Sequence, residues 1–131
     1  MKLLIDTHIW LWSRAEPARL KRRVARALES TSNELWLSPL SVWELTVLVE
    51  KGRVSIGSSV EEWARLALER VSVREAPLTK EVVFCSREIY LPHRDPVDTL
   101  LAATARFYDL TLVTADELML GGKGFRVLAN R

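Results

Sequence analysis

The stretch Leu3-Leu4-Ile5-Asp6-Thr7 decides the fold. Consecutive apolar residues in a short run indicate a strand that is buried on both faces, which is typical of a parallel sheet covered by helices. The same pattern of an apolar run and a following acid returns at Leu112-Val113-Thr114-Ala115-Asp116. The sequence therefore predicts two buried strands, each with an aspartate just beyond its carboxyl end.

Strands and helices alternate along the rest of the chain. Further strands are predicted at 34–38, 71–76 and 125–128. Helices are predicted at 7–13, from 17 through 28, at 39–52, 60–70, 81–88 and 95–108, with a helical turn at 118–120. This alternation implies right-handed crossovers and a parallel sheet with helices on both faces. We therefore predict an α/β fold, a three-layer α/β/α sandwich around a mainly parallel sheet.

Length and composition indicate one folded domain over residues 1–131. Apolar types make up 48% of the chain and charged types 27%, which is the balance of an ordinary folded protein. A single cysteine excludes an internal disulfide and a cysteine-rich metal site. No apolar run is long enough to cross a bilayer, and Asp6 interrupts any signal-peptide pattern. We expect a cytoplasmic protein with no membrane partner.

The charge balance alone does not identify a ligand. Nineteen basic residues against seventeen acidic ones leave a net charge of +2, too small to argue for nucleic acid. Fourteen of the basic residues are arginine, and a dense run of them lies between Arg14 and Arg26. Guanidinium groups match phosphate oxygens, so this run could face phosphates. A solvated helix face is an equally good interpretation.

Four of the five aspartates occupy positions that could converge. Asp6 and Asp116 each follow a predicted strand, whereas Asp95 and Asp98 begin a predicted helix. Glu44 lies in the first half of the helix that follows the second strand. In an open parallel sheet the functional crevice lies beyond the carboxyl ends of the strands, where the strand order reverses. Alternatively, each aspartate simply caps a helix or favours its dipole.

A cluster of carboxylates would call for a cation. Like charges a few ångströms apart raise one another's pKa, and a divalent ion relieves that repulsion. His8 and His93 are too scattered to be a zinc pair and are interpreted as structural hydrogen-bonding residues. Oxygen ligands without histidine or cysteine select Mg²⁺ or Mn²⁺. The chemistry that fits such a site is metal-assisted hydrolysis of a phosphodiester.

Four segments of the chain, in this order, resemble the PIN-domain nucleases and, within them, the VapC-type toxins of type II toxin–antitoxin systems. The segments are Leu4-Ile5-Asp6-Thr7-His8, Ser38-Pro39-Leu40-Ser41-Val42-Trp43-Glu44, His93-Arg94-Asp95-Pro96-Val97-Asp98-Thr99-Leu100-Leu101-Ala102-Ala103-Thr104-Ala105 and Leu112-Val113-Thr114-Ala115-Asp116. The resemblance extends from Lys2 to Leu128. It implies a PIN-like sandwich, Mg²⁺- or Mn²⁺-dependent endoribonuclease activity on RNA, a homodimer, and a cognate antitoxin whose tail covers the active site.

The resemblance also implies which residues act. The acidic quartet of the family corresponds to residues that would be both catalytic and metal-binding, namely Asp6, Glu44, Asp98 and Asp116. Asp98 is preferred to Asp95 as the ligand because it stands four residues before Ala102 in the helix. Asp95 is then a helix cap beside the site, and Thr7 and Thr114 are expected to orient the neighbouring carboxylates. Thr99 stands where the family commonly has an arginine.

Other functions remain as alternatives at this point. A PIN-like domain that binds RNA or protein without catalysis is one, although four intact acids argue against it. A phosphotransfer domain with Asp6 as nucleophile is disfavoured, because His8 occupies the place of the second aspartate that such an enzyme needs. The tryptophans fall on predicted apolar faces, which favours core or dimer contacts over base stacking: Trp10, Trp12, Trp36, Trp43 and Trp63.

Overall fold

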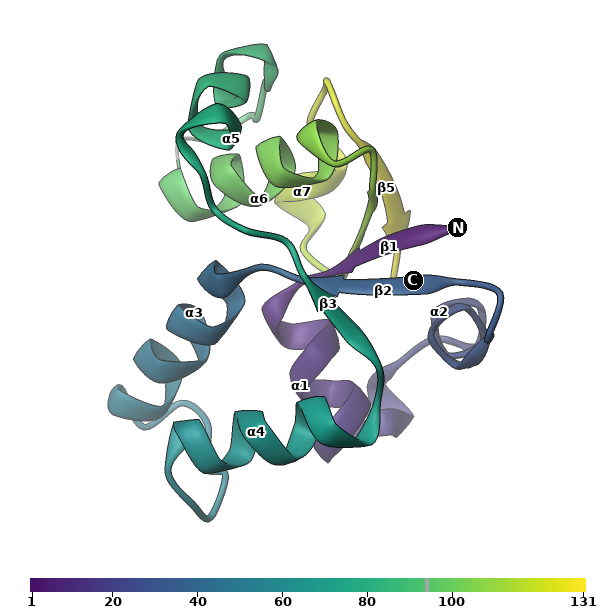
Figure 1. The fold of residues 1–131 in the computed structure, drawn as a ribbon, viewed down its shortest axis with the longest axis vertical. Coiled ribbons are helices and arrows are strands. Elements are labelled where there is room, and N and C mark those ends of the chain that lie inside the picture. The colour runs from purple at the N-terminus through teal and green to yellow at the C-terminus, as the bar shows by residue number, and fades with distance from the viewer. Residues whose placement is uncertain (94) are drawn as a thin grey trace.

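The computed structural model describes residues 1–93 and 95–131 (Figure 1). Its strands are β1 (Lys2–Ile5), β2 (Glu34–Leu37), β3 (Val73–Glu75), β4 (Thr111–Thr114) and β5 (Arg126–Ala129). Its α-helices are α1 (Thr7–Ala15), α2 (Arg22–Glu29), α3 (Pro39–Glu50), α4 (Val60–Arg70), α5 (Lys80–Cys85), α6 (Pro96–Phe107) and α7 (Glu117–Leu120). Two short 3₁₀ helices, η1 (Pro17–Arg19) and η2 (Ser86–Glu88), complete the described structure.

The five strands form one sheet in the order β3-β2-β1-β4-β5, and every neighbouring pair is parallel. The chain builds outward from β1 to β2 and β3 on one side, then returns to β1 to place β4 and β5 on the other. Strand order thus reverses between β1 and β4, where Ile5 is in register with Val113. The residues that follow these two strands meet at the same edge of the sheet.

Helices cover both faces of this sheet, as Figure 1 shows for α1 and α4 on one side and α5, α6 and α7 on the other. The alternation of side chains along β1 supplies both layers. Leu3 and Ile5 belong to the cluster shared with α1, α2 and α4, whereas Leu4 packs with Ala102 and Ala105 of α6. The predicted three-layer α/β/α sandwich is confirmed.

The helix predicted to run from Pro17 through Leu28 is interrupted. The chain forms η1, then leaves helical geometry at Leu20 and Lys21 before α2 begins. Asn130 holds the interruption from the far end of the chain: its Oδ1 accepts from the backbone N–H of Lys21 at 2.7 Å, and its Nδ2 donates to the carbonyl of Arg19 at 3.1 Å. These side-chain bonds replace the helical ones, and local sequence does not reveal them.

Smaller differences lie at the ends of elements and on one helix face. Residues 86–88 form η2 rather than the last turn of α5, and β3 is shorter than predicted. The predicted loop over 91–94 is seen in residues 91–93, and Arg94 lies outside the described residues. Of the two predicted roles for the tryptophans, a core contact does not apply to Trp43, which is 56% exposed, and a dimer contact stays a prediction for it. None of the helices in the described part of the chain has the length and apolarity needed to span a membrane.

We expect Asn130→Ala to lower the free energy of unfolding by about 2 kcal/mol, because it leaves the N–H of Lys21 and the carbonyl of Arg19, in two part-buried hydrogen bonds, without their partner. Urea denaturation measures the effect. Asn130→Asp keeps an acceptor for Lys21 but loses the donor to Arg19, so it should destabilise as well. Ser32→Ala on the exposed turn before β2 is the control. An Asn130→Ala protein as stable as the wild type would contradict this account.

Candidate active site

All the acids that the sequence singled out line one pocket of about 150 Å³ at the carboxyl edge of the sheet. Asp6 and Asp116 come from the ends of β1 and β4, Asp95 and Asp98 from the start of α6, and Glu44 from α3. Apolar side chains complete the wall, namely Leu101, Leu112 and Met119. The structure therefore brings together residues that are up to 110 positions apart in the sequence.

Asp6 and Asp116 are placed by the helices that follow them. Asp6 caps α1, with Oδ1 accepting from the N–H of Ile9 at 2.9 Å. Asp116 caps α7, with Oδ1 accepting from the N–H of Leu118 at 2.9 Å. The capping interpretation of these residues is therefore correct, and it is compatible with a site. A cap fixes the carboxylate where the strand ends, at the wall of the pocket.

The start of α6 supplies the other two aspartates. Asp95 is the N-cap, and its Oδ1 accepts from the N–H groups of Val97 at 2.9 Å and Asp98 at 3.3 Å. Pro96 occupies the first helical position, which its fixed backbone favours. Asp98 follows one turn into the helix with a half-buried side chain. The predicted helix start at Asp95-Pro96-Val97-Asp98 is confirmed.

His93 is a neighbour of the site that the sequence did not place there. Its Nδ1 accepts from the N–H of Asp95 at 3.2 Å, so the neutral ring carries its proton on Nε2. That Nε2 lies 3.5 Å from Oδ2 of Asp98, longer than a hydrogen bond, and it has no hydrogen-bond partner among the described residues. Sequence reasoning correctly gave His93 a structural hydrogen bond but missed its approach to Asp98. Its position two residues before the Asp95 cap was the available signal.

Each predicted threonine makes a hydrogen bond to a residue of the acidic pocket, although Thr7 does not bond to the adjacent Asp6. The hydroxyl of Thr7 donates to Oε1 of Glu44 at 2.6 Å and so fixes an acid that is 37 residues away. The hydroxyl of Thr114 accepts from the N–H of Asp116 at 3.0 Å. Thr114 also lies close enough to Asp6 to lower the pKa of its side chain. Both threonines are buried, so their bonds stabilise the wall of the pocket.

Burial and mutual repulsion make two of the carboxylates hard to ionise. Burial raises the pKa of Asp6 to about 6, against the hydrogen bonds from Thr114 and Ile9 that lower it. Burial, together with the charges of Asp95, Asp116 and Glu44, raises the pKa of Asp98 to about 7, against His93, which lowers it. The pocket is a concentration of negative charge that its own protein groups do not neutralise.

The donor set fits a hard divalent cation by its chemistry. All the ionisable side chains of the wall other than His8 are carboxylates, neither lysine nor arginine lines it, and a cation would relieve the repulsion that raises the pKa of Asp98. Within residues 1–93 and 95–131, no three Asp, Glu, His or Cys side chains are already arranged to hold a metal ion. Binding would have to draw the carboxylates together.

The family model of the PIN domain matches residues 3–120 of this chain. The chain belongs to the PIN-domain family. Ribonuclease VapC22 of Mycobacterium tuberculosis is 33% identical to it over 117 residues, which are 87% of this chain and 86% of that protein. This likeness confirms the resemblance to the VapC-type members of the family.

Two solved structures share the fold. VapBC2 from Rickettsia felis, bound to a DNA fragment from its promoter, has a TM-score of 0.73 and 17% identity, with 98% of each chain covered. A toxin–antitoxin complex from Klebsiella pneumoniae has a TM-score of 0.64 and 21% identity, again with 98% of each chain covered. At these identities the structures confirm the PIN-like sandwich as a fold.

The metal-free protein should lose stability as pH rises from 5 to 8. Asp98 and Asp6 have a pKa of about 7 and about 6 in the folded protein against 3.8 as the reference value, so the folded state binds more protons over this range. Stability gained by protonation is present at low pH and is lost as pH rises, by about 4 kcal/mol in all. Urea denaturation in EDTA at several pH values measures it.

Asp98→Asn should remove most of this pH dependence, because the amide does not titrate. Asp109→Asn is the matched control, since its side chain is 82% exposed and lies outside the pocket. A wild-type protein that becomes more stable between pH 5 and 8, or an Asp98→Asn protein with the wild-type slope, would contradict the crowding of carboxylates described above.

Proposed function

We propose that this chain is a divalent-metal-dependent endoribonuclease and the toxin of a toxin–antitoxin pair, acting as one domain over residues 1–131. The observation that carries the proposal is the convergence of Asp6, Glu44, Asp98 and Asp116 on one pocket at the point where strand order reverses. Membership of the PIN-domain family and the likeness to a protein named as a ribonuclease support the same conclusion.

Mg²⁺ or Mn²⁺ is the proposed cofactor. Asp6, Asp98 and Asp116 would hold the ion, and Glu44 would hold a second ion or orient the attacking water. When bound, such an ion supplies electrostatic stabilisation of the phosphate and a more acidic water. Thr7 keeps the Glu44 carboxylate turned toward β1, and the caps at Asp6 and Asp116 keep those acids at the strand ends.

Helix ends provide the chain's own attraction for a phosphate. The N-termini of α1 and α6 both begin at the pocket, with Asp6 and Asp95 as their caps. Each brings partial positive charge from its free N–H groups, which favours an anion nearby. Leu101, Leu112 and Met119 form an apolar wall that limits water around the reacting group. The pocket therefore combines cation-binding acids with a polarised surface for the scissile phosphate.

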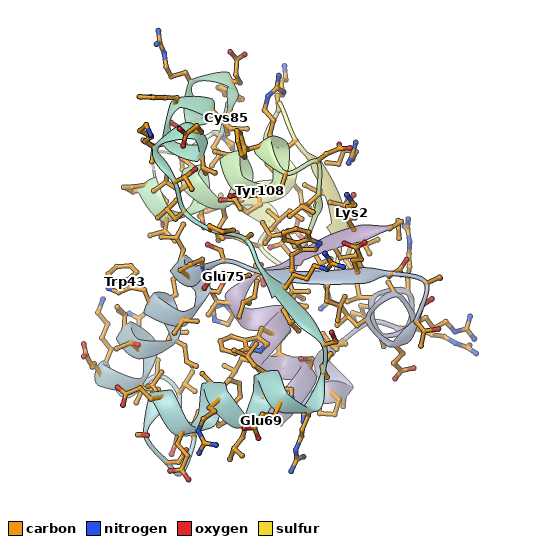
Figure 2. The ribbon with its side chains drawn as sticks, viewed as in Figure 1. Lys2, Trp43, Glu69, Glu75, Cys85 and Tyr108 are labelled. Atoms are coloured by element: carbon orange, nitrogen blue, oxygen red, sulfur yellow. The ribbon has the colours of Figure 1, made fainter. Side chains whose placement is uncertain are left out.

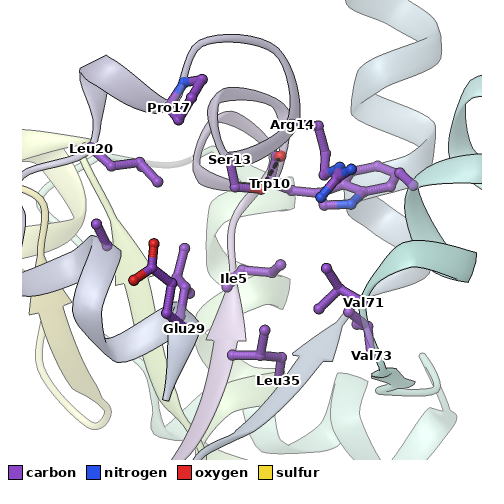
Figure 3. Close-up of a pocket in the computed structure, with 13 residues that line it drawn as sticks. Ile5, Trp10, Ser13, Arg14, Pro17, Leu20, Glu29, Leu35, Val71 and Val73 are labelled. Carbon is purple, nitrogen blue, oxygen red and sulfur yellow. Dashed lines mark hydrogen bonds between the residues drawn. The ribbon is translucent and has the colours of Figure 1, made fainter. Parts of the chain in front are cut away.

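An antitoxin is the proposed protein partner, because the structural neighbours include toxin–antitoxin complexes. The structure offers an apolar anchor for one in a second cavity of about 250 Å³, enclosed by α1, α2, α4 and the sheet (Figure 3). Ile5, Leu35 and Val73 form its floor, with Trp10 and Leu20 at its sides. A tail continuing from there would cover the acidic pocket. We place the pair in the cytoplasm, where RNA is found.

A homodimer is the other proposed assembly. Trp43 on α3 and Phe84 on α5 are 56% and 65% exposed, and Val83 and Leu78 beside Phe84 are also exposed. Figure 2 shows Trp43 directed away from the body of the molecule. Large exposed aromatic side chains are typical centres of protein interfaces. We propose that these residues contact a second copy of the chain.

Purified protein should cleave a total RNA or tRNA pool with Mg²⁺ or Mn²⁺ and stop when EDTA is added. Asp6→Asn and Asp98→Asn should each reduce the rate at least about 100-fold, because each removes a charge on which the ion depends. Glu61→Gln on the exposed face of α4 is the matched control and should cleave normally. Metal-independent cutting, or equal activity in the variants, would point to a contaminating nuclease.

Folded, antitoxin-free protein that cuts no RNA would overturn the nuclease and favour the non-catalytic RNA- or protein-binding module. In that case the same preparation should still be tested for RNA binding. Manganese should raise the melting temperature of the wild type but not of Asp98→Asn if the pocket holds an ion, and this readout does not depend on turnover.

Trp43→Glu should weaken self-association at least about tenfold, since a buried tryptophan at an interface commonly contributes that much. Sedimentation velocity over a range of concentrations measures the dimer constant. Leu66→Glu on α4, also at an exposed apolar position, is the control and should associate like the wild type. A wild-type monomer at every concentration, or a Trp43→Glu protein that dimerises normally, would show that this face is not the interface.

A further inference from the structure

A groove of about 670 Å³ lies at the amino-terminal edge of the sheet, opposite the acidic pocket. It runs between α2 on one side and the beginnings of β4 and β5 on the other. The helix and these two strands are far apart in the sequence and meet only in the folded protein. Arg23, Arg26 and Arg126 line it together with the polar side chains of Asn33 and Thr111. Neither Asp nor Glu is among its lining residues. We call the groove lined by these three arginines, Asn33 and Thr111 the basic groove.

The fold turns the arginines of α2 toward this groove. Val24 is fully buried and anchors the helix on the sheet, and Ala27 and Leu28 pack beside it. The packing of this apolar side leaves Arg23 and Arg26, three residues apart, exposed at the groove. Within the described residues neither has a carboxylate at ion-pair distance. Two guanidinium groups are therefore available to an external anion.

Arg126 is held in place from the other wall. Its Nη2 donates to the backbone carbonyl of Asp109 at 3.1 Å and to Oδ1 of Asp109 at 2.7 Å. Asp109 has a left-handed backbone, with φ at 56°, which directs both acceptors to the same nitrogen. Although this ion pair reduces the net charge at Arg126, it fixes one edge of the groove. The basic groove thus has the fixed guanidinium of Arg126 on one wall and the unpaired guanidiniums of Arg23 and Arg26 on the other.

Two other arginines of the run make contacts away from the basic groove. Arg19 stacks on the ring of Trp12 at 4.3 Å and pairs with Glu16 at 3.4 Å. Arg14 is half-buried at the wall of the apolar cavity. The run therefore has no single role: its arginines differ in whether they are placed to contact a phosphate. Arg23 and Arg26 are the members of the run that reach the basic groove.

We propose that the basic groove binds the phosphate backbone of the RNA substrate at a distance from the bond that is cut. This inference rests on the proposed ribonuclease function. Guanidinium groups match phosphate oxygens, and a chain that must bring a polyanion to an acidic pocket benefits from a separate source of attraction. RNA is favoured over an acidic protein segment because the proposed reaction already brings RNA to the molecule.

The separation of the two surfaces specifies the kind of RNA. They lie at opposite ends of four-residue strands, so the RNA must extend at least about 13 Å beyond the cleaved bond. A short oligonucleotide in the acidic pocket would not reach the groove. A folded RNA, which carries phosphates in several directions from one site, would reach both. The basic groove thus favours long or folded RNA over short single strands.

The test measures binding without turnover. Fluorescein-labelled tRNA is titrated with the full-length protein in EDTA, where cleavage is suppressed, over a series of NaCl concentrations. Arg23→Ala combined with Arg26→Ala should lower the affinity about tenfold and reduce the slope of log affinity against log salt by about 2. Arg65→Ala combined with Arg70→Ala on α4 removes the same charge elsewhere and should leave the slope within error of the wild type.

A second arm uses the active protein with Mn²⁺. The Arg23 and Arg26 double variant should raise KM for tRNA but leave cleavage of a dinucleotide, which has no phosphate beyond the cleaved bond, unchanged. Equal tRNA affinity and salt slope in the double variant and the wild type would overturn the proposal, as would an equal loss in the α4 control. Competition by poly-glutamate as strong as that by RNA would assign the groove to an acidic protein segment. If no protein cleaves RNA but the double variant still loses tRNA affinity and salt slope as expected, only the proposed nuclease activity would be contradicted.

Discussion

Repulsion among carboxylates at one edge of the sheet is the constraint on which the rest of this structure depends. Two parallel strands end side by side, and each is followed by an aspartate that begins a helix. The fold tolerates this concentration of charge through local compensation, because N–H groups at helix starts bond to Asp6, Asp95 and Asp116. The compensation is incomplete at Asp98, whose pKa rises to about 7.

The parts of the structure that sequence predicted are those that local patterns encode. Apolar runs before Asp6 and Asp116 marked the two central strands, and the Asp95-Pro96 pair marked the start of α6. Because the carboxyl ends of parallel strands share an edge, these local patterns also predicted that the acids meet. The assignment of particular roles to the acids stays a prediction.

Two of the features that sequence missed depend on residues distant along the chain. Asn130 interrupts a helix more than a hundred positions earlier, and Thr7 bonds to Glu44 rather than to its neighbour. His93 approaches Asp98 only because the turn before α6 folds back on its own cap. Trp43 is exposed although Val42, Leu45 and Val49 of the same helix pack in the core. Such contacts leave no local periodicity.

The position of β1 at the centre of the sheet has a consequence for the newly made chain. Its two neighbours are β2, made soon afterwards, and β4, made more than a hundred residues later. The pocket wall therefore lacks Asp116 until the chain has been made well past β4, and Asn130 joins later still. A partly synthesised copy consequently has no complete pocket, so ribosomes translating this message carry nascent chains in which the site has not yet formed.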